Sequence, residues 1–168
     1  MKTFNVIGCG RVGQTLAALL HRHAQVQVQD LYSRSFSSAE QAAQFVGAGQ
    51  PVAELAQMRA ADVWLLSVPD AQVGAAAQAL ANAQGAKLAG SIVFHNSGFL
   101  SAAVLQPLQD LGCHVASAHP VLNFASPETG VRQFAGTPCG LEGDALALAW
   151  LNTALTAIGG RCFEIASA

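Results

Sequence analysis

The sequence predicts an α/β fold in which a mostly parallel sheet of about six to eight strands carries helices on both faces. Short runs rich in Val and Ile alternate with Ala- and Leu-rich stretches of helical period, which is typical of a parallel sheet covered by helices. The chain has 168 residues, about the length of one domain. We therefore expect residues 1–168 to form a single domain.

The first elements are the clearest. Residues 4–7, apolar except for Asn5, are expected to form a strand, and the glycine-rich segment that follows opens a helix with Val12, Leu16 and Leu20 on one face. Short, mainly apolar runs predict further strands at residues 28–33, 63–68, 91–95, 115–119, 137–141 and 162–165, with a short one near 51–52.

The remaining helices are expected between these strands, at residues 38–45, 71–83, 101–111, 126–134 and 144–158. Pro107 interrupts the fourth helical segment, so we expect a kink or a later start there, and Gly112 ends it. Ser126 before Pro127 is an N-cap followed by proline at the first helical position. Glycines 159 and 160 end the last helix.

The composition excludes several classes of protein. The net charge is −2 without a basic run, so we expect no nucleic-acid partner. The longest apolar stretch, residues 145–151, is far shorter than the roughly 20 residues of a membrane span, and the N-terminus lacks a secretory signal. Four scattered cysteines without a Cys-x-x-Cys pair favour a reducing compartment and no metal site. We expect a cytoplasmic location.

The segment Gly8-Cys9-Gly10-Arg11-Val12-Gly13 follows a strand and opens a helix, which is the context of a dinucleotide-binding motif. In such a motif the first glycine allows the tight turn and the second lets the backbone approach the pyrophosphate. The third lets helix and strand pack closely. The motif predicts a doubly wound Rossmann-type fold and a nicotinamide cofactor site. A glycine turn without a ligand is the alternative.

The end of the second strand predicts which cofactor binds. Ser33, Arg34 and Ser35 offer a guanidinium and two hydroxyls, the donors that a 2′-phosphate needs, so NADP is favoured over NAD. Asp30 leaves NAD open, because a strand ending three residues earlier would place its carboxylate at the ribose. A solvated surface charge is the alternative role of Arg34.

Three further strand ends are expected at the same edge of the sheet. Val68 and Pro69 follow a buried strand and would contact the cofactor, unless they form an ordinary turn with Asp70 as N-cap. The two other strand ends carry His95-Asn96-Ser97-Gly98 and His119-Pro120, with Asn96 as a further cofactor contact.

Hydride transfer between an alcohol and a carbonyl needs a group that moves the hydroxyl proton, and histidine with serine suits this role. His119 and Ser97 are the candidate catalytic pair, with His95 as a third candidate. For each histidine taken singly, a hydrogen-bonded role at a strand end is the alternative.

Several of these segments together resemble a family of Rossmann-like NADP oxidoreductases related to pyrroline-5-carboxylate reductase, the deazaflavin-dependent NADP oxidoreductases and the β-hydroxyacid dehydrogenases. The resemblance rests on residues 7–13, 32–35, 67–70, 95–98, 118–120 and 136–138. His119-Pro120 also resembles the His-Pro-Met-Ala-Gly segment of prephenate dehydrogenases, in which the histidine and an upstream serine contact the substrate hydroxyl. The resemblance implies those roles for His119 and Ser97, although residues 121–123 depart from the pattern.

Members of these families usually continue into a helical domain that forms much of the substrate pocket and the dimer contact, and this sequence lacks that region. We therefore expect a small-molecule substrate and either a homodimer or contact with such a domain, which the low charged fraction of 11% also favours. The sequence predicts an NADP-dependent oxidoreductase or its cofactor domain. The alternatives are a non-catalytic NADP-binding or sensing module and, disfavoured by the full glycine motif, a methyltransferase.

Overall fold

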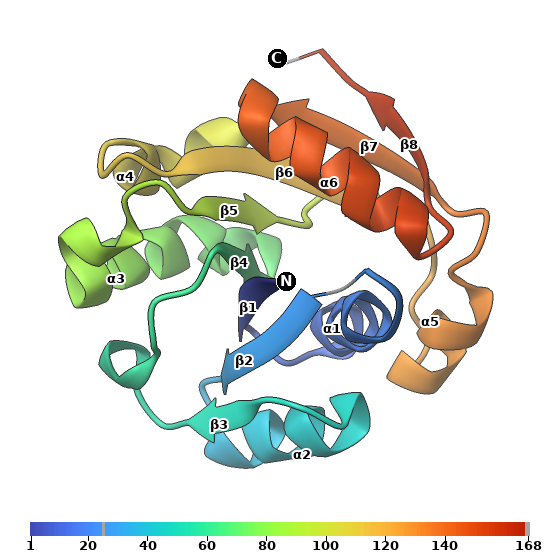
Figure 1. Ribbon diagram of the computed structural model, residues 1–168, viewed down its shortest axis with the longest axis horizontal. Helices are drawn as coiled ribbons and strands as arrows, with labels where there is room; N and C mark the ends of the chain where they lie inside the picture. The colour runs from blue at the N-terminus through green and yellow to red at the C-terminus, as the bar shows by residue number, and fades with distance from the viewer. Residues whose placement is uncertain (25, 167–168) are drawn as a thin grey trace.

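The computed structural model describes residues 1–24 and 26–166, which form an eight-stranded sheet between two layers of helices (Figure 1). The strands are β1 (Lys2–Ile7), β2 (Val26–Tyr32), β3 (Gln50–Val52), β4 (Val63–Leu66), β5 (Ile92–His95), β6 (His114–Pro120), β7 (Pro138–Gly143) and β8 (Arg161–Glu164). The α-helices are α1 (Arg11–His23), α2 (Phe36–Val46), α3 (Val73–Gln84), α4 (Gln106–Gln109), α5 (Pro127–Gln133) and α6 (Ala145–Ala157).

The strand order confirms the predicted doubly wound fold. The order is β3-β2-β1-β4-β5-β6-β7-β8, and all neighbours run parallel except β6 and β7. The chain moves outward from β1 to β3 and then returns to β4 on the other side of β1. This reversal opens a crevice at the carboxyl ends of β1 and β4, where doubly wound proteins bind ligands.

The core has two layers, one on each face of the sheet. Helices α1, α2 and α6 bury their apolar faces against one face of the sheet, around Phe4 and Phe94, whose rings lie 6.3 Å apart. Helix α3 and the segment 102–108 cover the other face, around the fully buried Trp64. Figure 1 shows α3 and α4 on one side of the sheet, with α1, α5 and α6 on the other.

Short 3₁₀ turns, a proline and a serine cap determine where three of the helices begin. A 3₁₀ turn, Asp70–Gln72, precedes α3, so that helix begins later than the sequence predicted. The segment with Pro107 divides into a 3₁₀ turn, Ala102–Leu105, and α4, because a proline fits only the first turn of a helix. The Ser126 hydroxyl accepts the Thr129 N–H at 3.1 Å and caps α5 as predicted. No helix within residues 1–24 and 26–166 has the length and apolar character needed to cross a bilayer.

Candidate functional site

The turn between β1 and α1 is built on two tightly packed glycines. Gly8 has a φ of +98°, and a Cβ atom there would overlap the carbonyl oxygen of Ser67. A Cβ at Gly13 would overlap the carbonyl oxygen of Gly8. The Gly8 N–H donates to Tyr32 O at 2.8 Å, and the Ser67 N–H donates to Ile7 O at 2.7 Å. Packing within the protein therefore requires glycine at positions 8 and 13.

Gly10 differs from these two glycines. A Cβ atom at this position would meet no described atom within 4 Å, and the residue is exposed. Gly10 is the N-cap of α1, whose first turn carries no acidic side chain. The free N–H groups of a helix N-terminus favour an anion. The space in front of Gly10 is therefore a cradle that a side chain would fill.

A cleft of about 580 Å³ opens beside this cradle, along the carboxyl ends of β1, β4, β5 and β6. Eight predicted site residues line it: Gly10, Arg11, Val12, Val68, Pro69, Asn96, Ser97 and His119. Ser67, Asp70, Gly98 and Phe124 complete the wall. The structure thus brings together residues from four separate segments of the chain. Gly8, Cys9 and Gly13 do not line the cleft, and burial raises the pKa of the Cys9 thiol to about 12.

The end of β2 lies outside this cleft. Ser33 is half-buried, and Arg34 and Ser35 are exposed after the strand ends at Tyr32. Asp30, in contrast, is 1% exposed and bound to Arg59, whose Nη2 lies 2.7 Å from its Oδ1 and whose backbone N–H donates to its Oδ2 at 2.6 Å. The Asp30 carboxylate thus holds the segment after β3 and is not presented at the end of the strand.

His95 lies beneath the cleft and does not line it. The imidazole is fully buried, its Nδ1 accepts the Ser97 N–H at 3.1 Å, and its Nε2 lies 3.0 Å from Ser101 O. An N–H only donates and a carbonyl only accepts, so the ring is the neutral tautomer with hydrogen on Nε2. Burial lowers the pKa of His95, and the nearby carboxylates of Glu142 and Asp70 oppose this shift. Both nitrogens of this candidate catalytic residue are engaged within the protein.

Ser97 and His119 both line the cleft. The Ser97 hydroxyl oxygen accepts the N–H groups of Phe99 and Leu100 at 3.1 and 3.2 Å, which leaves its hydrogen available to a ligand. Nδ1 of His119 lies 3.4 Å from Asn96 O. The ring of His119 covers Gly98, where a Cβ atom would lie 2.5 Å from Nε2. The turn after β5 therefore supports the imidazole directly.

Phe124 is the lining residue that sequence reasoning missed. It belongs to the connection between β6 and α5, and its ring packs beside Gly130, where a Cβ atom would lie 3.1 Å from Cδ1 of Phe124. Gly130 in turn lies against Thr15 of α1. The long connection after His119 was the only signal in the sequence, and it did not distinguish Phe124 from its neighbours.

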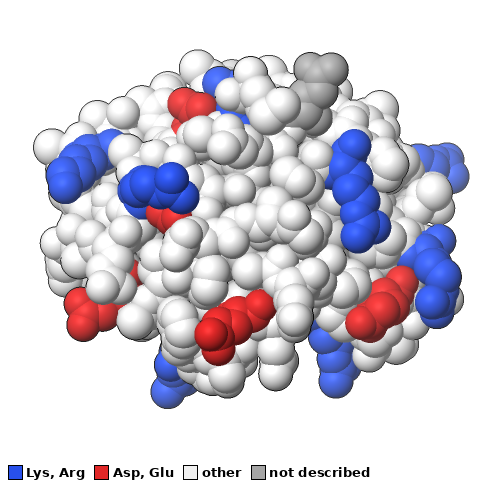
Figure 2. All heavy atoms as spheres, turned by 60° about the horizontal axis from the view of Figure 1, so that its bottom comes forward, with Lys and Arg blue, Asp and Glu red and all other residues white. Residues whose placement is uncertain are grey.

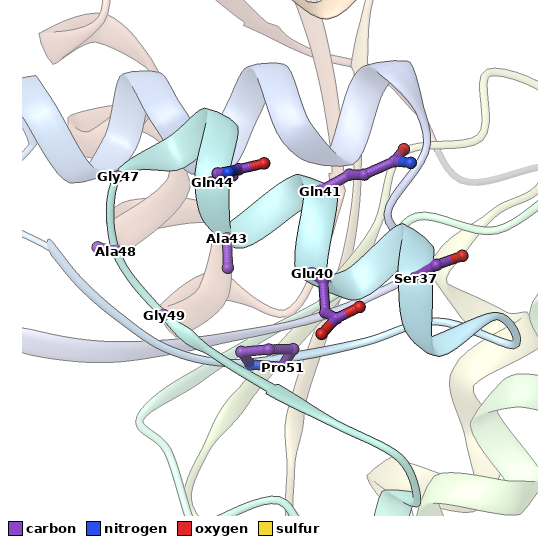
Figure 3. Close-up of a pocket in the computed structure, with 9 residues that line it drawn as sticks. All are labelled: Ser37, Glu40, Gln41, Ala43, Gln44, Gly47, Ala48, Gly49 and Pro51. Carbon is purple, nitrogen blue, oxygen red and sulfur yellow. The ribbon is translucent and has the colours of Figure 1, made fainter.

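A second hollow, of about 680 Å³, lies between α2 and residues 47–51 (Figure 3). Its charged or hydroxyl-bearing side chains are Ser37 and Glu40, and it lies away from the glycine turn. Figure 2 shows charges of both signs interspersed over the face on the β3 side of the molecule, without a large patch of one sign. The hollow contains one ionisable side chain, Glu40, and none of the motif glycines.

The strand order and the glycine turn define a Rossmann-type domain. A family model described as a Rossmann-like domain matches residues 2–120, and the chain belongs to this family. No curated protein matches the sequence.

Solved structures share the fold. A putative NADP oxidoreductase from Bacteroides fragilis superposes with a TM-score of 0.81 at 21% identity, over 98% of this chain and 60% of its own. An arogenate dehydrogenase from Synechocystis gives 0.77 at 22% identity, over 97% and 59% of the two chains. A prephenate dehydrogenase from A. aeolicus, in complex with hydroxyphenyl propionate and NAD⁺, gives 0.77 at 17%, over 99% and 60%. The chain thus spans about three fifths of the length of these proteins.

Proposed function

We propose that this chain is the NADP-binding domain of an oxidoreductase that transfers hydride between nicotinamide and a small carbonyl, imine or hydroxyl compound. One observation carries the proposal. Of the three motif glycines, Gly8 and Gly13 are required by internal packing, whereas Gly10 faces open space at the cleft. A glycine that the protein itself does not need is explained by a ligand whose phosphates approach the backbone.

The preference for NADP rests on the end of β2. The exposed Arg34 stands between two serines and offers charge-assisted hydrogen bonds to a 2′-phosphate. The acidic residue that would favour NAD is Asp30, and its carboxylate is held by Arg59. The names of the structural neighbours include both an NADP oxidoreductase and an NAD⁺ complex. The preference for NADP over NAD is therefore supported by the residues at the end of β2 alone.

The chemistry at the cleft divides between the cofactor and the protein. NADP, when bound, supplies or accepts the hydride. The Ser97 hydroxyl is fixed by two backbone N–H groups and can donate its hydrogen to a substrate oxygen or nitrogen. Contact with Asn96 O through Nδ1–H leaves Nε2 of His119 free to take up a proton. Val12, Val68 and Phe124 supply apolar wall that limits water near the reacting atoms.

A calorimetric titration with NADPH, NADH and S-adenosylmethionine tests the cofactor site. We expect NADPH to bind, and Gly10→Ala to weaken it at least about tenfold, because the methyl group fills the cradle at the helix N-terminus. Gly74→Ala in α3 is the matched control: its Cβ would lie at an ordinary 3.6 Å from Val104, outside the cleft. Absence of NADPH binding, or equal affinities in the two variants, would contradict the proposal.

Replacing Arg34 with Ala tests the 2′-phosphate assignment. Loss of charge-assisted hydrogen bonds, each contributing about 1.5–3 kcal/mol, should weaken NADPH roughly 10- to 100-fold. NADH lacks the 2′-phosphate, so its dissociation constant should change less than about twofold. Equal losses for the two cofactors would refute the assignment.

Turnover distinguishes an oxidoreductase from a binding module. We expect at least one compound from a panel of small ketones and imines to support NADPH oxidation. The assay is made with the chain alone and with any longer natural protein that contains it. His119→Asn should lower the rate by about 10²–10⁴-fold with little change in NADPH affinity, because proton transfer is lost while the cradle is kept. NADPH binding without turnover in any form would identify a sensing module instead.

A further inference from the structure

We propose that His95 is a positioning residue, whose neutral imidazole fixes the turn after β5 and thereby places Ser97 and His119 at the cleft. The inference rests on the proposed function for its catalytic meaning. It replaces the candidate catalytic role of His95, because the buried ring does not line the cleft and both of its nitrogens are engaged elsewhere.

The imidazole joins the two ends of one turn. Nδ1 accepts the N–H of Ser97, two residues along the chain, while Nε2 lies 3.0 Å from the carbonyl oxygen of Ser101, six residues along. Between these points the Ser97 hydroxyl accepts the next two backbone N–H groups, of Phe99 and Leu100. A single buried ring thus closes residues 95–101 into one hydrogen-bonded unit.

This unit continues to His119. Gly98 follows Ser97 and lies against the His119 ring, with a Cβ position 2.5–2.7 Å from three of its atoms. The carbonyl of Asn96, inside the same turn, lies 3.4 Å from Nδ1 of His119. Two contacts from the turn therefore define where the His119 ring lies. A displacement of Ser97 would move both candidate catalytic groups together.

The turn requires an uncharged ring at position 95. A proton on Nδ1 would point a donor at the Ser97 N–H, which is also a donor, and the hydrogen bond would be lost. The charged groups that act on the ring are Glu142 of β7 and Asp70 before α3. Glu142 is engaged with the turn as well, because its Oε2 accepts the Ala102 N–H at 2.7 Å. These carboxylates favour the charged ring, whereas burial favours the neutral one.

The first test uses the unmodified protein without cofactor. Nitrogen NMR shifts report the protonation of His95, and the ring-current shift of the Gly98 Hα atoms reports its contact with His119. As the pH falls, we expect the Ser97 amide shift and the Gly98 Hα shift to change with the same midpoint as His95. Titration of His95 without these changes would overturn the proposal.

The second test compares His95→Phe with His95→Asn. Phenylalanine fills the space but accepts no hydrogen bond, so the Ser97 amide should exchange with solvent roughly two- to tenfold faster and the Gly98 shift should move. Asparagine places its Oδ1 near the position of Nδ1 and should restore slow exchange. His114→Phe, at the opposite end of the neighbouring strand β6, is the matched control and should leave both signals unchanged.

Unchanged Ser97 and Gly98 signals in folded His95→Phe would overturn the proposal, as would fast exchange in folded His95→Asn. Where His95→Phe does not fold, the Asn variant and the pH titration decide. NADPH titrations of wild type are made separately, because the phosphate cradle at Gly10 lies on another turn. Failure of NADPH to bind would overturn the proposed function while the NMR result on His95 stood.

Discussion

Two turns at the same edge of the sheet are held in opposite ways. The turn after β1 is closed by backbone packing, since side chains at Gly8 and Gly13 would overlap carbonyl oxygens. The turn after β5 is closed by a side chain, the imidazole of His95. The first leaves free backbone N–H groups toward the cleft, whereas the second presents a hydroxyl and an imidazole. Backbone closure suits a site for phosphates, and side-chain closure suits a site for proton transfer.

The largest loss of stability is expected for a substitution that disrupts the turn after β1. Gly8→Ala combines a positive φ with overlap against the Ser67 carbonyl, two costs of about 1–3 kcal/mol each, so we expect the free energy of unfolding to fall by about 2–6 kcal/mol. Gly10→Ala should cost less than about 1 kcal/mol, the difference between glycine and alanine at an N-cap. Urea unfolding measures both. Similar losses for the two variants would show that packing does not distinguish these glycines.

A smaller effect is expected in the second turn. Gly98→Ala places a methyl group against the His119 ring, which is the end of a side chain and can rotate away. We expect a loss of about 1–2 kcal/mol of unfolding free energy, less than at Gly8, with His119 displaced from its contact with Asn96. Urea unfolding and the carbon shifts of the His119 ring test this. An unmoved ring would contradict the contact between Gly98 and His119.

The comparison also explains what the sequence could predict. The glycine turn was predictable, because a backbone that excludes side chains leaves glycine at fixed spacing. The strand ends were predictable too, so Ser97 and His119 were correctly expected to lie near each other. The role of the His95 ring was not, because a histidine that hydrogen-bonds a turn and one that faces a substrate have the same sequence.

The positions of two other side chains depend on tertiary contacts that the sequence does not reveal. The carboxylate of Asp30 is directed by Arg59, which lies 29 residues further along the chain. Phe124 reaches the cleft from a connection without periodicity, where its ring packs beside Gly130. No sequence periodicity predicts either contact, because each joins segments that only the folded chain brings together.

The smallest expected effect is the pH dependence that His95 gives to stability. Burial lowers its pKa below the usual 6.5, so on acidification the unfolded chain binds a proton before the folded protein does. Stability from this group is therefore complete above about pH 6.5 and falls as the pH decreases toward the lower folded value, with a slope of at most about 1.4 kcal/mol per pH unit. His95→Asn should lack this part of the slope in urea unfolding between pH 7 and pH 5. An identical slope in wild type and variant would mean that the ring takes up its proton as readily in the folded protein as in the unfolded chain, and that the turn after β5 does not depend on a neutral His95.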